Sequence, residues 1–190
     1  DIKTAGRLGI KVQNTPNASS IAVAEMAMTL MISITNHLVQ ADTSMHNKNW
    51  LKNQLKRTEL FGKTLGIIGY GRIGNEVARR AKAFGMTIIG YHYRDVKSEF
   101  GEVSTNLKKV LNHSDYVSLH LPLTEKTKKF INKTTITECK PTVFIINTCR
   151  GGTVDEYDLS EALKKGNIAA AIFYSTTLIF AGLVVATAIS

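Results

Sequence analysis

Apolar residues follow two different patterns along this chain, and the two patterns alternate. Short and nearly uninterrupted apolar runs occur at Leu65–Ile68, Met86–Tyr91, Tyr116–Leu121 and Val143–Asn147. Runs of this length are typical of strands that are buried on both faces. Between and after these runs, apolar residues recur at helical spacing within residues 73–84, 107–111 and 155–166. The alternation predicts an α/β fold, in which a doubly wound parallel sheet is covered by helices on both faces.

The part of the chain before the first of these strands contains one strongly apolar helix and one polar connection. Ser19 or Ser20 can cap a helix in which the residues from Ile21 to Ile34 leave hardly any polar face. Such a helix must be buried on most of its sides. Gln40–Arg57 is polar, and it is predicted to be a connecting segment that the ring of the only tryptophan, Trp50, holds in place.

The first strand runs directly into a glycine-rich turn, and a helical pattern begins immediately afterwards. The turn has the spacing Gly69-x-Gly71-x-x-Gly74. A phosphate can approach such a turn because glycine has no Cβ, and the amides of the first helical turn then face the anion. A glycine turn that serves packing alone is the alternative. The strand before the turn and the helix after it favour a Rossmann-type dinucleotide-binding domain with the pyrophosphate at this position.

In this motif, the end of the second strand carries the group that meets the adenosine ribose. The expected carboxylate is missing, because His92, Tyr93 and Arg94 follow the strand and Asp95 is the nearest acid. His92 stands where an acid would accept a hydrogen bond from the 2′-hydroxyl, and Arg94 is near enough to meet a 2′-phosphate. We therefore predict that His92 and Arg94 contact the cofactor, which is NAD or NADP with less bias toward NAD than usual.

Composition argues against several other kinds of protein. The chain has 24 basic and 15 acidic residues, but the basic residues are scattered and lack the interleaved aromatic residues of a nucleic-acid surface. The two cysteines, Cys139 and Cys149, are too few for a disulfide framework or a zinc site, so no metal is predicted. No amino-terminal signal pattern is present, and a reducing cytoplasm fits best.

A series of motifs resembles those of the D-isomer-specific 2-hydroxyacid dehydrogenases, in order and with matching spacing, over about residues 9–171. The motifs are Asn14-Thr-Pro-Asn17, Ala22-Val-Ala-Glu25, Gly62-Lys-Thr-Leu-Gly-Ile-Ile-Gly69, Gly71-Arg-Ile-Gly74, His120-Leu-Pro-Leu-Thr124, Asn147-Thr-Cys-Arg-Gly-Gly152 and Val154-Asp-Glu156. They look most like the 3-phosphoglycerate dehydrogenase branch of the family, which acts in serine biosynthesis. The resemblance implies that residues 19–173 form the dinucleotide-binding domain, that residues 1–18 are a remnant and hinge of the second, substrate-binding domain, and that residues 174–190 are an apolar tail unlike the family.

The resemblance also implies which residues contact the cofactor. They are Gly69, Gly71, Arg72, Ile73 and Gly74 at the pyrophosphate, Leu121 and Pro122 at the adenosine and ribose, and Thr148, Cys149 and Arg150 at the nicotinamide. Arg150 would be the catalytic arginine, since a guanidinium can hold a carboxylate at two points and polarise the neighbouring 2-oxo group during hydride transfer. The implied substrate is a small D-2-hydroxy acid, 3-phosphoglycerate or a similar one, and the full-length protein is expected to be a homo-oligomer.

Two residues that the family uses in catalysis have no counterpart in this sequence. The family uses a histidine as general acid/base and a glutamate that orients it, and both lie beyond the end of the resemblance. In ungapped register, Tyr174 stands where the family has a cofactor-contacting aspartate, and Ile179 stands where it has the glutamate. This chain alone is therefore expected to be inactive. The alternative function is a dinucleotide-binding module without turnover, either similar to the corepressors of this fold or tethered to a membrane.

The carboxyl-terminal residues 167–190 contain no charged side chain. Ile168–Phe173 is predicted to pair in parallel beside the strand that ends at Asn147. Beyond Tyr174, a helix or a loose extension with exposed apolar surface is expected. Ile168–Ile189 is long enough to cross a bilayer if helical, but a strand cannot also begin a spanning helix. A foreign or out-of-frame end is therefore favoured over a membrane anchor.

Overall fold

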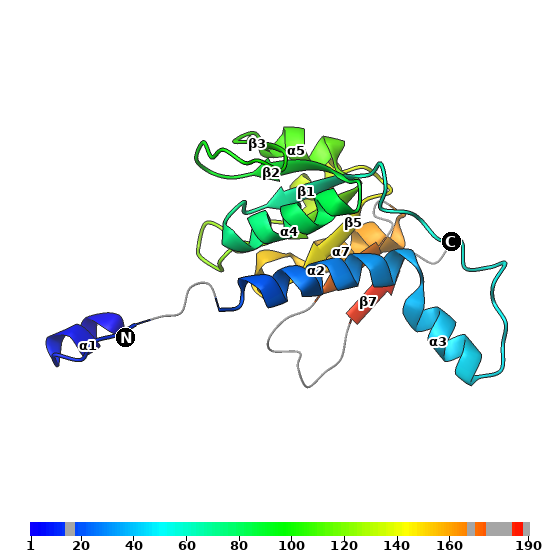
Figure 1. The fold of residues 1–190 in the computed structure, drawn as a ribbon, viewed down its shortest axis with the longest axis horizontal. Coiled ribbons are helices and arrows are strands. Elements are labelled where there is room, and N and C mark those ends of the chain that lie inside the picture. The colour runs from blue at the N-terminus through cyan, green and yellow to red at the C-terminus, as the bar shows by residue number, and fades with distance from the viewer. Residues whose placement is uncertain (14–17, 167–169, 174–183, 188–190) are drawn as a thin grey trace.

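A seven-stranded sheet forms the centre of the fold, and its strand order is β3-β2-β1-β4-β5-β6-β7 (Figure 1). The computed structural model describes residues 1–13, 18–166, 170–173 and 184–187. The strands are β1 (Thr64–Ile68), β2 (Thr87–Tyr91), β3 (Glu102–Ser104), β4 (Tyr116–Leu119), β5 (Phe144–Asn147), β6 (Ala170–Phe173) and β7 (Val184–Thr187). Strands β1 to β6 pair in parallel, and β7 is antiparallel to β6. The strand order reverses between β1 and β4, which is the place where open α/β sheets bind ligands.

Helices pack on both faces of this sheet, so the predicted doubly wound α/β fold is confirmed. The helices are α1 (Ile2–Arg7), α2 (Ser20–Thr35), α3 (Leu38–His46), α4 (Arg72–Ala83), α5 (Leu107–His113), α6 (Lys133–Thr137) and α7 (Glu156–Lys164). One apolar core joins α2 and α4 to the sheet, and a second joins α5, α6 and α7. Side chains of β1 alternate between the cores, with Leu65 and Ile67 in the first and Ile68 in the second.

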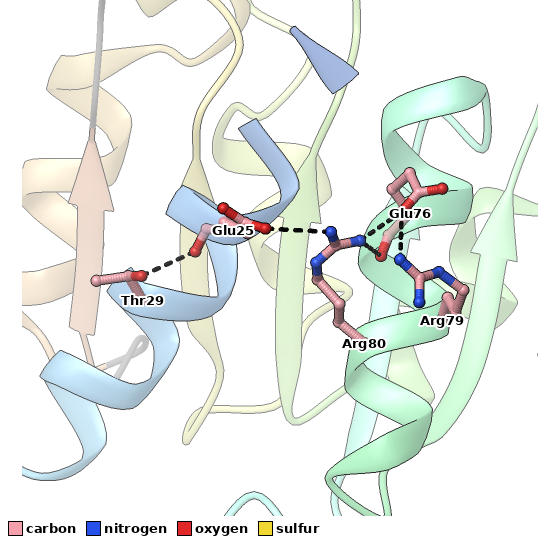
Figure 2. Close-up of polar contacts among 5 residues, drawn as sticks. All are labelled: Glu25, Thr29, Glu76, Arg79 and Arg80. Carbon is pink, nitrogen blue, oxygen red and sulfur yellow. Dashed lines mark hydrogen bonds and ion pairs between the residues drawn. The ribbon is translucent and has the colours of Figure 1, made fainter. Parts of the chain in front are cut away.

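Helix α2 packs along α4 through apolar side chains and is also joined to it by charged groups. Arg80 of α4 lies 3.3 Å from Glu25 of α2 and also contacts Glu76 within α4 (Figure 2). Hydrogen bonds from Arg79 and Arg80 hold the pKa of Glu76 below its ordinary value. The expectation that α2 is buried on most sides is only partly met, since Ile21 is 54% exposed. Its amino-terminal end reaches the carboxyl ends of the strands.

The segment around Trp50 differs from its prediction. Residues 38–46, partly assigned to a connection, form helix α3, and only Ser44 of this helix is buried. Trp50 is 73% exposed and therefore does not hold the segment in place. Helix α1 was not expected either, and it buries no residue and lies apart from the sheet in Figure 1. Within the described part of the chain, no single helix has the length and apolar character of a membrane span, although α2 and α3, bent by 60°, meet those criteria as a pair.

The end of the chain supports one prediction and contradicts another. Strand β6 pairs in parallel with β5, with Phe144 opposite Ala170 and Asn147 opposite Phe173, as predicted for this run. The expectation of a helix or loose extension after Tyr174 is wrong for Val184–Thr187, which forms β7 against β6. The physical reason is that β6 has a second edge, whose backbone N–H and C=O groups another strand can satisfy. Residues 174–183 and 188–190 lie outside the described residues.

Candidate functional site

A cavity of about 620 Å³ lies at the switch point of the sheet, beside the carboxyl ends of β1, β4 and β5. Its walls contain nine of the residues that the sequence predicted for the cofactor site: Gly69, Gly71, Arg72, Ile73, Leu121, Pro122, Thr148, Cys149 and Arg150. Five further lining residues were not predicted: Ser19, Ser20, Val23, His120 and Leu123. The first three of these belong to the start of α2, and the last two follow β4. Three strand ends and two helix ends thus meet in one place.

The three glycines of the turn have two different roles. Gly69 adopts φ +94°, and a Cβ there would lie 2.6 Å from the carbonyl oxygen of His120, so only glycine fits. A Cβ on Gly71 would have no heavy atom within 4 Å, which leaves open space between the backbone and the cavity. Gly74 is buried, and a Cβ there would lie 2.9 Å from the carbonyl oxygen of Gly69. Gly69 and Gly74 therefore allow close packing, and Gly71 allows a ligand to approach.

Helix α4 begins at the cavity wall with properties that suit an anion. Its first residue is Arg72, and its amino-terminal cap, Gly71, makes no side-chain hydrogen bond to the helix. No acidic residue lies in the first turn. The first amides of a helix carry partial positive charge and point along the axis, so an uncapped end of this kind favours a phosphate.

The turn after β5 is held by the side chain of Asn147, for which no individual role was predicted. Asn147 Oδ1 accepts from the backbone N–H of Cys149 at 3.0 Å, and Asn147 Nδ2 donates to the carbonyl oxygen of Arg150 at 3.2 Å. The hydroxyl of Thr153 donates to the same carbonyl at 2.6 Å. Both Asn147 and Thr153 are buried. The backbone of this turn is thus fixed, and the exposed side chain of Arg150 extends from it at the cavity wall.

Comparison with known proteins identifies the architecture. Residues 28–174 match the sequence profile of the "D-isomer specific 2-hydroxyacid dehydrogenase, NAD binding domain". The chain belongs to the D-isomer-specific 2-hydroxyacid dehydrogenase family. This result confirms the resemblance found in the sequence motifs, and it identifies the described fold as the NAD-binding domain of the family.

Relatives within the family are named for different acids. The chain is 46% identical over 171 residues to the hydroxypyruvate reductase of Thermotoga maritima, and 44% identical over 175 residues to the D-3-phosphoglycerate dehydrogenase of Methanocaldococcus jannaschii. These matches cover 90% of this chain but only 56% and 33% of the two relatives. The crystal structure of D-lactate dehydrogenase with NAD+ from Lactobacillus jensenii is similar with a TM-score of 0.80 and 32% identity, over 90% of this chain and 52% of that one. The chain therefore spans about half the length of the reductase.

The cavity fits the nicotinamide dinucleotide that the family binds. Besides the open space at Gly71, two buried polar atoms at the cavity wall, His120 Nδ1 and Thr148 Oγ1, have no hydrogen-bond partner among the described residues. Buried polar atoms are costly unless a partner satisfies them, and a polar ligand can supply that partner. Burial lowers the pKa of His120 from its ordinary 6.5 to about 4. The His120 ring is therefore neutral at pH 7, and its other nitrogen, Nε2, lies 2.9 Å from Ser118 Oγ.

Three predicted dehydrogenase site residues lie outside the cavity wall. Gly74 is behind the turn, where it allows α4 to approach β1. His92 and Arg94 follow β2, beyond the glycine turn and away from β4 and β5. Their separation from the cavity follows from the sheet order, because β2 lies on the opposite side of β1 from β4. The remaining predicted residues are brought together as expected, whereas their individual roles stay predictions.

Proposed function

We propose that this chain is the dinucleotide-binding part of an oxidoreductase that acts on the CH–OH group of a small D-2-hydroxy acid. The observation that carries the proposal is the juxtaposition, in one cavity, of the Gly69–Gly71 turn and the Arg150 side chain. The turn suits the pyrophosphate of NAD(P), and a guanidinium suits a carboxylate. Family membership supports the same assignment, and the full-length protein is expected to be a cytoplasmic homo-oligomer.

The residues of this chain would bind and orient both reactants. The amides of Arg72 and Ile73 would hold the pyrophosphate, and Leu121 and Pro122 would line the adenosine and ribose side. Arg150 would hold the substrate carboxylate and polarise the adjacent oxygen, which lowers the barrier by placing positive charge where negative charge develops. The bound nicotinamide supplies the hydride chemistry.

Hydroxypyruvate, 3-phosphoglycerate and D-lactate, the acids suggested by the names of the relatives, all carry a carboxylate beside the reacting carbon. Arg150 can recognise this shared group and does not distinguish the three acids. Motif resemblance favours 3-phosphoglycerate, and thus serine biosynthesis, as the substrate context. His120 is not proposed as the proton donor, because a pKa of about 4 keeps it unprotonated at neutral pH, whereas a general acid works best with a pKa near the working pH.

The glycine turn provides the direct test of dinucleotide binding. Gly71→Ala should leave the fold intact, because its Cβ meets no protein atom within 4 Å, yet it fills the space that a phosphate would enter. We expect calorimetry to show at least about tenfold weaker binding of NADH and NADPH, a loss of about 1.4 kcal/mol. Gly6→Ala is the matched control, since its Cβ also has no neighbour within 4 Å and lies in α1, away from the cavity. Equal affinity of the wild type and Gly71→Ala would contradict the proposal.

A dinucleotide-binding module without turnover is the alternative function, and Arg150 separates it from the dehydrogenase. A module of this kind has no need to hold a substrate carboxylate. If the dehydrogenase proposal is correct, oxamate, an unreactive 2-oxo carboxylate, should tighten NADH binding to the wild-type chain and fail to do so with Arg150→Gln. Binding of NADH that oxamate leaves unchanged in both chains would favour the module, whether corepressor-like or membrane-tethered.

A further inference from the structure

The backbone at the end of β2 is fixed beside the glycine turn. Gly69 and Tyr70 both donate hydrogen bonds to the carbonyl oxygen of Tyr91, at 3.0 and 3.1 Å. On the other side, the N–H of His92 donates to the carbonyl oxygen of Ser104 in β3 at 3.1 Å. The residues that follow Tyr91 therefore have a defined position relative to the start of α4, the helix end that suits a pyrophosphate. In a dinucleotide site, this position adjoins the adenosine ribose.

The side chain at this position is that of His92, not a carboxylate. An imidazole is either neutral or cationic. The Nδ1 atom of His92 lies 3.2 Å from both the backbone nitrogen and the carbonyl oxygen of Arg94, so the ring is engaged with the backbone of the turn in either tautomer. Neither tautomer carries a negative charge. A carboxylate here would accept a hydrogen bond from a ribose 2′-hydroxyl and would repel a 2′-phosphate. This strand end provides neither effect.

The guanidinium of Arg94 is held in place by an aromatic ring while its edge stays available. Its Cζ atom lies 4.7 Å from the centroid of the Tyr93 ring, and that ring lies 4.6 Å from the ring of His92. A guanidinium stacked on an aromatic face keeps its N–H donors free at the edge. None of the ion pairs within the described residues involves Arg94 or the adjacent Asp95.

We propose that Arg94 binds the 2′-phosphate of NADP(H), so that this chain binds NADP(H) more tightly than NAD(H). The proposal rests on the proposed function, because it assumes that the pyrophosphate binds at the start of α4. It adds which of the two dinucleotides is preferred, and it assigns that preference to one side chain. A guanidinium pairs with a phosphate through two parallel hydrogen bonds, and His92 removes the repulsion that an acid would cause.

The preference can be measured by calorimetric titration of the wild-type chain with NADPH and NADH at one ionic strength. The wild type should bind NADPH at least about tenfold more tightly than NADH. The reason is that a hydrogen bond between the guanidinium and the charged 2′-phosphate, which NADH lacks, contributes at least about a factor of ten in affinity. Arg94→Gln should reduce NADPH affinity by about tenfold or more and leave NADH affinity unchanged. Arg57→Gln is the matched control, because Arg57 is also exposed and outside every ion pair of the described residues, and it should change neither affinity.

Restoring an acid provides the reciprocal test. His92→Asp should lower NADPH affinity and raise NADH affinity, which a loss of folding cannot mimic. Equal or tighter binding of NADH by the wild type, or an unchanged NADPH affinity in Arg94→Gln, would overturn the inference while leaving the proposed function intact. If neither dinucleotide bound to the wild type, the proposed function would fail as well.

Discussion

Replacing His120 by glutamine should remove part of the acid sensitivity of this fold. Burial lowers the pKa of the His120 imidazole from 6.5 to about 4, because its protonation would place a charge away from water. In the unfolded chain, the same imidazole is hydrated and titrates near its ordinary value. The two states therefore bind different numbers of protons between about pH 6.5 and pH 4.

The sign and size of the effect follow from this difference. As pH falls through 6.5, the unfolded state takes up a proton that the folded state refuses, so the free energy of unfolding decreases. The stability that the neutral ring contributes is fully present above pH 6.5 and is lost as pH falls toward 4. A shift from 6.5 to about 4 corresponds to about 3 kcal/mol in total, at 1.36 kcal/mol per pH unit. About 2 kcal/mol of this should be lost between pH 7 and pH 4.5.

The measurement is urea unfolding of the dinucleotide-free chain at pH 7 and pH 4.5, followed by circular dichroism. Fluorescence is a poor probe, because the single tryptophan, Trp50, is 73% exposed in the folded state. The wild type should lose about 2 kcal/mol more than His120→Gln over this range. His46→Gln is the matched control, since the His46 side chain is 79% exposed, and it should lose as much as the wild type.

Comparing variants removes the contribution of acidic groups. Hydrogen bonds and nearby lysines hold the pKa of Asp115 below its ordinary value despite its burial, and that carboxylate also contributes acid sensitivity. It is present in every variant, so its contribution cancels. An identical loss of stability in the wild type and in His120→Gln would refute the reasoning, because it would mean that the His120 ring is hydrated or titrates normally in the folded state.

Two further substitutions test packing and polar burial within the fold. Gly69→Ala should destabilise the fold by at least about 1–2 kcal/mol, which is the cost of a left-handed backbone for a residue with a side chain. The reason is that φ is +94° at Gly69 and that a Cβ there would lie 2.6 Å from the His120 carbonyl oxygen. Urea unfolding should show this loss of stability, and a loss no larger than that of Gly71→Ala would count against the prediction. Tyr116→Phe should stabilise the fold by about 1–3 kcal/mol, the cost of an unsatisfied buried polar group, because the hydroxyl has no partner within the described residues. A lower melting temperature for Tyr116→Phe would show that the hydroxyl is satisfied in solution.

The strand, glycine turn and helix around Gly69 could be predicted from local sequence alone. The residues there have local propensities and periodicity that agree with the final fold. The same is true of β6, whose continuous apolar run suits a strand between two neighbours. The parallel pairing of β1, β2, β4 and β5 also followed the general rule for alternating strands and helices.

Predictions failed where a segment owes its structure to its neighbours. β3 is three residues long and carries no apolar pattern, and it is a strand because Val103 pairs with Gly90 of β2. Helix α3 buries only Ser44, so no apolar periodicity could reveal it. Trp50 was expected to hold its segment in place because large rings usually bury surface, but it is 73% exposed.

The sequence by itself determined the fold class, the unit of strand, glycine turn and helix, and the family, because these depend on the types and spacing of residues within short segments. Tertiary structure decided which of these residues share a cavity. Arg150 and Gly71 are distant in the chain, and they meet because the ends of parallel strands β1 and β5 lie at one edge of the sheet. The same geometry brought His120 into the cavity wall with a buried nitrogen, and moved Gly74 behind the turn. Burial and strand pairing of this kind arise only when distant segments pack together. A local sequence pattern therefore cannot predict them.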